Sequence, residues 1–141
     1  MQIRPAQASD YESLMYLYNL FVDSDRYSKL DNDSFSKVLE SKSNFVYVAK
    51  ENDVMVGFAS FSVRWVVRYP KLIAELDELF VMEEYRKSKI GYLLMRQVEE
   101  KAKELDCYRL YIESHYSHKA AHALYEKMGY INYGYHFMKN I

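Results

Sequence analysis

A short run of cations follows an apolar stretch in the second half of the sequence. Arg86, Lys87 and Lys89 lie just before Gly91, and from Ile90 onward apolar residues recur at helical spacing. Free amides at a helix start carry a positive partial charge, and a glycine lets a ligand approach the backbone without interference from a Cβ atom. The segment therefore predicts a site for a diphosphate or a similar polyanion. An ordinary solvated basic turn is the alternative interpretation.

Three carboxylates lie in a second segment that is otherwise apolar. Glu75, Asp77 and Glu78 fall within residues 73–81, which have the composition of a buried strand. Strict alternation puts Glu75 and Asp77 on one face and Glu78 on the other, and a β-bulge would change that parity. Carboxylates in a strand between helices are costly to bury. They predict either a general base or an anionic rim that attracts a cationic substrate.

These residues must be positioned by the elements around them. A capping box formed by Ser9 and Glu12 predicts the start of the first helix, and Phe35 lies on the buried side of a second, shorter helix. The other expected elements are strands at 3–5, 45–49, 54–67, 72–82, 109–112, 130–131 and 135–139, and helices at 90–105 and 117–128, the last ended by Gly129.

The order of these elements indicates an α/β fold class. Residues 72–112 place a helix between two strands, which requires parallel pairing of those strands and a right-handed crossover. The hairpin that precedes them is antiparallel. We therefore expect a single-domain fold with a mixed, mostly antiparallel sheet, one parallel strand pair and helices on both faces.

Composition excludes several classes of protein. The 141 residues suit one domain, 1–141, and 19 Lys+Arg against 20 Asp+Glu leave no basic field for nucleic acid. No apolar run approaches the roughly 18–20 residues of a membrane span, and the single cysteine, Cys107, suits a reducing compartment. We expect a cytoplasmic protein without nucleic-acid or membrane partners. Its tyrosine-rich end, residues 130–137, offers a strand edge through which a homodimer could form.

Two motifs give the sequence a resemblance to the Gcn5-related N-acetyltransferases (GNAT). The family's acetyl-coenzyme A loop, Arg/Gln-x-x-Gly-x-Gly/Ala, resembles the basic segment: Arg86 and Gly91 match its first and last positions, and Lys89 and Lys87 stand where members have glycines. The family's closing helix-and-strand motif resembles Ala121-x-x-Leu124-Tyr125-Glu126-x-x-Gly129-Tyr130, with His118 where the family often has Asn. The order of elements also agrees over nearly the whole chain.

The resemblance implies an enzyme that transfers acetyl from acetyl-CoA to a primary amine by direct attack in a ternary complex. It implies that Tyr125 protonates the departing thiolate. It also implies that Glu75 or Glu78 assists deprotonation of the amine, of which only about 0.1% is neutral at pH 7.4. By the same resemblance, the coenzyme is expected to contact Leu79, Phe80, Val81, Arg86, Lys87, Ser88, Lys89, Ile90, Gly91, Tyr92 and His118.

Neither a covalent acetyl-cysteine nor a metal is expected to take part. Cys107 falls outside the segments that carry the resemblance. His118, His122 and Glu126 share one helical face at a spacing that can hold a divalent metal, but no further ligand-rich segment completes the set. We interpret them as polar residues that flank the substrate or coenzyme cleft.

The acceptor is expected to be a small-molecule amine. The segment 75–82 looks like the aminoalkylphosphonate acetyltransferase branch of the family, and Arg64, Arg68 and Lys71 could then meet an anionic group of the substrate. One alternative is an enzyme of the same fold that acts on a protein or peptide. A second alternative is a non-catalytic module that binds acyl-CoA.

Overall fold

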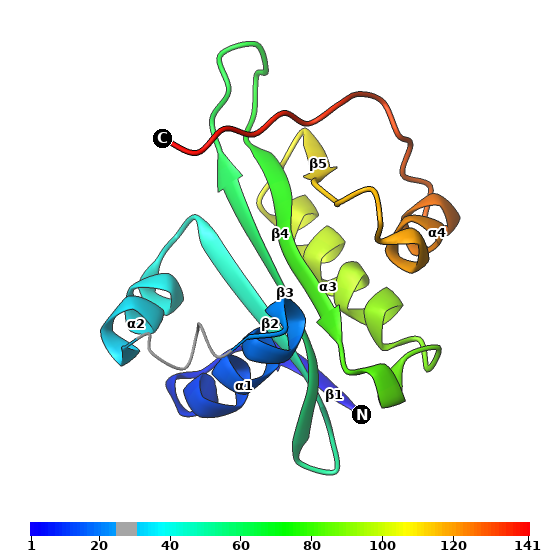
Figure 1. Ribbon diagram of the computed structural model, residues 1–141. Helices are drawn as coiled ribbons and strands as arrows, with labels where there is room; N and C mark the ends of the chain where they lie inside the picture. Colours follow the sequence, from blue (N-terminus) through cyan, green and yellow to red (C-terminus); the bar gives the residue numbers. More distant parts are fainter. Residues whose placement is uncertain (25–30) are drawn as a thin grey trace.

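The computed structural model describes residues 1–24 and 31–141, and its elements follow one another much as the sequence predicts (Figure 1). In chain order they are β1 (Gln2–Pro5), η1 (Ala8–Asp10), α1 (Tyr11–Val22), α2 (Asn32–Glu40), β2 (Asn44–Glu51), β3 (Val54–Arg64), β4 (Ile73–Val81), η3 (Glu83–Tyr85), α3 (Ile90–Glu104), β5 (Arg109–Ile112) and α4 (Lys119–Lys127).

The five strands form one sheet in the order β1-β2-β3-β4-β5. The first three neighbouring pairs are antiparallel, and β4 and β5 are parallel, with α3 as the connection between them. Figure 1 shows α1 and α2 against one face of the sheet and α3 against the other. The expected α/β fold class, a mixed sheet with one parallel pair and helices on both faces, is confirmed.

Two hydrophobic cores lie on the two faces of the sheet. On the first face Leu14 and Leu17 of α1 pack with Phe58 of β3, and all three side chains are almost completely buried. On the second face α3 packs through residues such as Leu94 against the same strands. Burial of one such side chain contributes about 1.5–3 kcal/mol, so these contacts fix both helix layers on the sheet.

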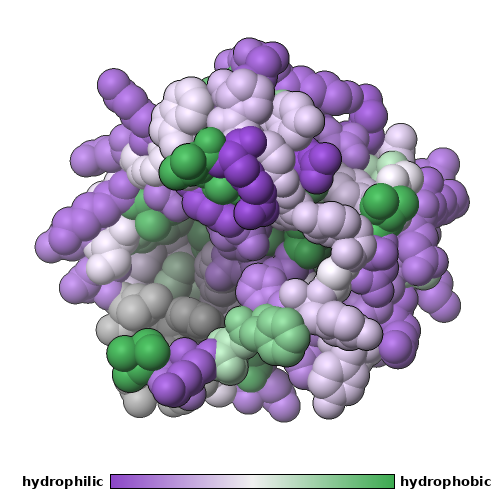
Figure 2. Space-filling model, turned by 90° about the horizontal axis from the view of Figure 1, so that it is seen from above, coloured by the Kyte–Doolittle hydropathy of each residue, from purple (hydrophilic) through white to green (hydrophobic). Residues whose placement is uncertain are grey.

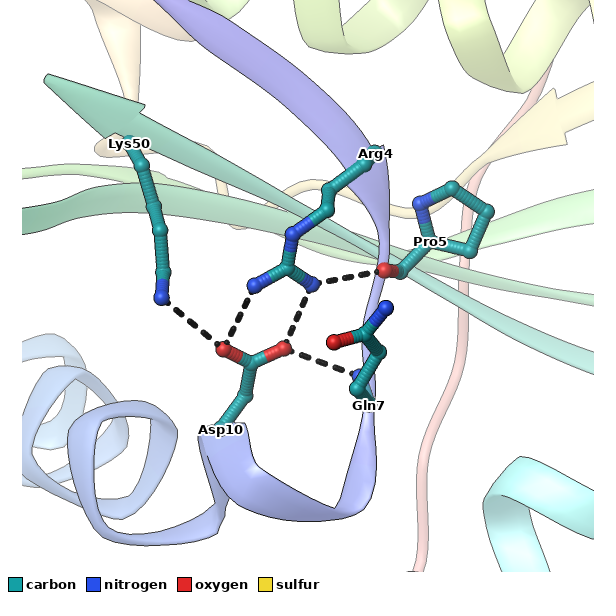
Figure 3. A network of polar contacts seen from close by, with 5 residues as sticks. All are labelled: Arg4, Pro5, Gln7, Asp10 and Lys50. Carbon is teal, nitrogen blue, oxygen red and sulfur yellow. Dashed lines mark hydrogen bonds and ion pairs between the residues drawn. The ribbon is translucent and has the colours of Figure 1, made fainter. Parts of the chain in front are cut away.

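A buried carboxylate ties the N-terminal edge of the sheet to the start of α1 (Figure 3). Asp10 accepts two hydrogen bonds from the Arg4 guanidinium, at 2.6 and 2.9 Å, and one from the main-chain N–H of Gln7 at 2.8 Å. Lys50 Nζ lies 3.2 Å from the same carboxylate. These partners, Arg4 first among them, lower the pKa of Asp10 to about 2.

This arrangement corrects the predicted capping box. Ser9 lies inside the short helix η1 and does not cap α1, which begins only at Tyr11. A turn of η1 precedes the helix, so the reciprocal bond is made at Asp10 rather than at Glu12.

The chain after α4 also differs from the prediction. The strands expected at 130–131 and 135–139 are absent from the described C-terminal segment, which crosses one end of the molecule as an irregular tail (Figure 1). Seen from that end, the surface is mainly hydrophilic, with apolar side chains exposed in separate small groups (Figure 2). Tyr135 and Phe137 are 93% and 88% exposed. Alternating apolar residues favour a strand, but they form one only where another strand offers its backbone groups.

Within the described ranges, each helix is either too short or too polar to cross a lipid bilayer.

Candidate active site

A β-bulge in β4 determines where the strand carboxylates point. Ser60 of β3 lies opposite Glu78, but the next residue, Phe61, lies opposite Leu76, so Asp77 is an extra residue without a partner position. The extra residue interrupts the alternation of faces along β4. Of the two possibilities that the sequence left open, strict alternation and a bulge that changes the parity, the strand follows the second.

The bulge places all three carboxylates on the same face of the sheet. Alternate residues of β3 share one face, and each of them contacts one carboxylate of β4: Ser60 donates to Glu78, Ser62 donates to Asp77 at 3.2 Å, and Arg64 pairs with Glu75. This is the face covered by α1, because Tyr18 of α1 donates a hydrogen bond to Glu78 at 2.7 Å.

Glu78 is held by two hydroxyl groups but keeps one oxygen available. The donors Tyr18 and Ser60 both contact Oε2. Among the described residues no donor contacts Oε1, and no buried side-chain oxygen is left without a partner. Oε1 is therefore the atom of Glu78 that a ligand can reach.

A small pocket of about 200 Å³ opens beside Glu78. It lies between α1, α2 and the sheet, and most of its wall is apolar or aromatic. Its lining consists of Tyr11, Leu14, Met15, Tyr18, Asp31, Ser34, Phe35, Val38, Val46 and Glu78. The pocket combines an apolar wall with a carboxylate, which suits the ammonium end of an organic amine.

Asp77 is the one carboxylate of the three that residue type and spacing did not single out as a base. Burial against the sheet is the main cause that raises its pKa to about 6, and the negative charges of Glu78 and Glu75 add to the effect. The hydrogen bond from Ser62 and the charge of Arg64 act in the opposite direction. The Asp77 residue is nevertheless exposed to solvent, so substrate and water can reach its carboxylate. A carboxylate with this pKa is suited to accept a proton near neutral pH.

The strand β5 ends after four residues, whereas its neighbour β4 continues for five more. Ile73 to Leu76 pair with Arg109 to Ile112, and the remainder of β4 has no neighbour on that side among the described strands. Leu79, Phe80 and Val81 therefore keep β3 as a partner on one side and turn the other side of their backbone to a gap, which Figure 1 shows between β4 and the chain that runs from β5 to α4.

The basic segment after β4 has an unusual backbone. Lys87 and Lys89 have φ angles of 64° and 68°, the left-handed region that glycine adopts more readily than lysine. These are the two positions at which the resembling family has glycines. The left-handed conformation is thus kept here by lysines, which adds two cations to the loop.

The start of α3 presents uncapped amides beside this loop. Lys89 is the N-cap residue and provides no side-chain cap, and the first turn contains no acidic residue. The first N–H with a helical acceptor is that of Leu93, which donates to the Lys89 carbonyl at 2.9 Å. The amides of Ile90, Gly91 and Tyr92 are therefore free for an anion.

Other residues of the segment fix its position. Arg86 Nε donates to the Val81 carbonyl at 3.0 Å, and Ser88 Oγ donates to the Tyr85 carbonyl. An added Cβ at Gly91 would lie 3.4 Å from Leu124 of α4 and 3.9 Å from Val81, which is ordinary contact. Gly91 therefore lies between α4 and the end of β4 with room for a methyl group.

The structure gives Ile90 and Tyr92 different surroundings. Ile90 is 1% exposed and belongs to the core, so only its backbone amide can serve a ligand. Tyr92 is 42% exposed and lines a separate open hollow with Met1 and Ile3.

Tyr125 lies on α4 with its ring partly buried against the core on the α3 face. Its ring meets that of Tyr130 edge to face at 6.1 Å, and Tyr130 donates a hydrogen bond to Glu99 of α3 at 3.0 Å. Burial raises the pKa of Tyr125 to about 12. The phenol is therefore protonated at neutral pH and can act as an acid.

The histidines of the α4 region make contacts of their own. His118 occupies the N-cap position of α4, and its ring lies 5.8 Å from that of His115. His122 Nε2 lies 3.0 Å from Ser114 Oγ. In the described part of the chain, no group of three or more potential ligands could hold a metal ion. Burial, with the charge of Asp106, raises the pKa of the Cys107 thiol, which does not favour a thiolate.

Comparisons with known proteins agree with this geometry. The model of the acetyltransferase (GNAT) family matches residues 11–130, and the chain belongs to that family. This confirms the expected resemblance and the enzyme class, an N-acetyltransferase.

Individual relatives share the fold over nearly the full chain. The sequence is 24% identical over 138 residues to an aminoalkylphosphonate N-acetyltransferase of Salmonella typhimurium, which covers 98% of this chain and 90% of the relative. A protein of Agrobacterium tumefaciens described as an acetyltransferase superimposes with a TM-score of 0.90 at 23% identity, covering 100% of both chains. An aminoglycoside antibiotic 6′-N-acetyltransferase of Acinetobacter haemolyticus gives 0.79 at 21% identity, covering 100% of this chain and 99% of the other.

Proposed function

We propose that this protein transfers an acetyl group from acetyl-CoA to the primary amine of a small molecule, by direct attack of the amine in a ternary complex. One observation carries the proposal: the part of β4 that extends beyond β5 ends beside the uncapped start of α3. The two features are adjacent, since a Cβ at Gly91 would lie 3.9 Å from Val81. Together they offer a thioester a strand backbone and offer its diphosphate a set of free amides.

The basic segment would hold the coenzyme. The amides of Ile90, Gly91 and Tyr92 lie at the uncapped start of the helix, and the charges of Lys87 and Lys89 favour a diphosphate there. Arg86 and Ser88 keep the loop against the end of β4, and the backbone of residues 79–81 would lie along the thioester arm. His118, at the start of α4, would flank the same cleft. Acetyl-CoA itself supplies the activated acetyl group.

The carboxylates would receive the amine. Glu78 lines the pocket with Oε1 available for an ammonium group, whereas the Glu75 carboxylate is already paired with Arg64. We therefore assign the ammonium contact to Glu78, and we assign proton acceptance to Glu78 together with its neighbour Asp77.

The proton for the departing sulfur would come from Tyr125. Burial keeps the phenol protonated at neutral pH, so it can release its proton as negative charge develops on the sulfur. Two similar proteins, an aminoalkylphosphonate N-acetyltransferase and an aminoglycoside 6′-N-acetyltransferase, support a small amine as the acceptor. We place the reaction in the cytoplasm, in line with the single cysteine, and we keep the expected homodimer as part of the proposal.

The proposal is tested by measuring free thiol after the purified protein is mixed with acetyl-CoA and each of a panel of primary amines. We expect amine-dependent thiol release that falls at least about tenfold in Glu78→Gln and in Tyr125→Phe. Calorimetric binding of acetyl-CoA without thiol release for any amine would instead identify a non-catalytic coenzyme-binding module. Absence of both binding and release would refute the proposed function.

A further inference from the structure

The charged residues that line the small pocket, as far as the structure describes them, are two carboxylates. Glu78 of the sheet and Asp31, the N-cap residue of α2, both line the pocket. Asp31 accepts the main-chain N–H of Ser34 at 3.1 Å, a bond that lowers the pKa of the Asp31 carboxyl and keeps it ionised. Lys37 of α2 lies outside this lining, and its charge contributes to the lowered pKa of Asp31. Among the lining residues that the structure describes, none is a lysine or an arginine.

The three cations that the sequence suggested for an anionic substrate group are engaged elsewhere. Arg64 pairs with Glu75, and Lys71 Nζ lies 2.6 Å from Asp106. The Arg68 guanidinium lies over the ring of Tyr69, 4.9 Å from its centroid. These contacts place the three side chains in pairs outside the pocket lining, so a phosphonate group in the pocket would meet carboxylates and apolar groups.

The size of the pocket restricts the occupant further. Its volume of about 200 Å³ lies below the roughly 300–1,000 Å³ typical of sites for drug-sized ligands. Apolar side chains, among them Leu14, Met15 and Phe35, line the same pocket as the carboxylates of Asp31 and Glu78. A narrow molecule with an apolar middle fits this wall, whereas a bulky multi-ring amine would remain largely outside.

We propose that the acceptor is a linear alkane diamine and that Asp31 selects it by contacting the ammonium group that is not acetylated. The inference rests on the proposed acetyltransferase function. One amine binds at Oε1 of Glu78, gives up a proton to the carboxylates, and forms the amide bond as the thioester C–S bond breaks. The sulfur takes a proton and leaves as the thiol. The other amine stays protonated beside Asp31, where opposite charge and an apolar chain match both parts of the pocket.

The test compares matched substrates and matched variants. We would measure kcat/KM for 1,5-diaminopentane, 1-aminopentane and 2-aminoethylphosphonate by thiol release. Asp31→Asn removes the charge but retains a residue that caps helices well, so α2 stays formed. Asp33→Asn, at an exposed position of the same helix end outside the pocket lining, is the control.

We expect the wild type to prefer the diamine over the monoamine by about two- to fivefold, the range of one exposed ion pair, and to use the aminophosphonate least. Asp31→Asn should bring the diamine-to-monoamine ratio close to one, and Asp33→Asn should leave the ratio unchanged. Equal use of diamine and monoamine by the wild type, equal effects of the two variants, or preference for the aminophosphonate would overturn this inference alone. Absence of thiol release with every amine would overturn the proposed function as well.

Discussion

The hydroxyl of Tyr18 donates a hydrogen bond to Glu78 at 2.7 Å and so joins α1 to β4. The Tyr18 ring packs on Phe58 of the central strand β3, with centroids 4.4 Å apart. Tyr18 and Phe58 both belong to the hydrophobic core on this face of the sheet. The Tyr18 hydroxyl therefore holds the Glu78 carboxylate at the edge of the small pocket. The packing of the first helix thereby determines the geometry at the proposed acceptor site.

Removal of the Tyr18 hydroxyl tests this link. In Tyr18→Phe the ring still packs on Phe58, but Glu78 loses one charge-assisted hydrogen bond, for which a loss of about tenfold in kcat/KM is expected. Steady-state thiol release measures the effect, with Tyr16→Phe, 57% exposed on the same helix, as the control. Equal rates for Tyr18→Phe and the wild type would show that this bond does not position the carboxylate.

The pKa of Asp77, about 6, predicts the acid side of the pH profile. A base works only when deprotonated, so kcat/KM should fall about tenfold per pH unit below pH 6 and level off above it. Asp77→Asn should remove this limb and lower the plateau. Ser62→Ala should move the midpoint upward, since the Ser62 hydrogen bond lowers the pKa of Asp77. A limb that stays in place in Asp77→Asn would assign it to another group.

The left-handed lysines of the coenzyme loop predict a gain in stability on substitution. Lys89→Gly relieves a left-handed conformation that costs lysine about 1–2 kcal/mol. Because glycine loses more backbone entropy on folding, the expected net gain in the free energy of unfolding is only about 0.5–1 kcal/mol. Urea unfolding measures the difference. Lys103→Gly, at an exposed helical position of α3, should instead lose about 0.5–1 kcal/mol. Destabilisation by both substitutions would indicate that Lys89 makes contacts that outweigh its backbone strain.

Asp10 predicts a loss of stability in acid. Its pKa in the folded protein, about 2, lies below the ordinary value of 3.8, so its contribution is present above about pH 4 and is lost as the pH falls through 2. The shift corresponds to about 2 kcal/mol in the free energy of unfolding. Asp10→Asn should lose at least about this amount at pH 7, with exposed Glu40→Gln as the control, expected within about 0.5 kcal/mol. A pH dependence of unfolding that is the same in Asp10→Asn and the wild type would contradict this.

Sequence periodicity locates the helices and strands that bury one apolar face in the core. Residues 109–112 form the expected strand, and the helix after the basic segment begins at Ile90 as its apolar spacing indicates. The tail could not be predicted in the same way. Tyr135 and Phe137 alternate as strand residues do, but a strand also needs a neighbour, and sequence periodicity does not specify one.

In the candidate site, too, some features can be predicted from the sequence and others depend on the folded structure. The basic loop, Tyr125 and the three carboxylates can be found from residue type and spacing. The shared face of Glu78 and Asp77 depends on one extra residue in β4 relative to β3, a register that periodicity does not reveal. The contact of Tyr18 with Glu78 likewise arises only when α1 packs on the sheet.

The most direct test of acetyl transfer is mass spectrometry of the product after incubation of the protein with acetyl-CoA and 1,5-diaminopentane. The account predicts monoacetylated diamine in an amount equal to the free coenzyme A released, with little release when the amine is left out. Coenzyme A release that is the same with and without amine, and no acetylated product, would contradict it.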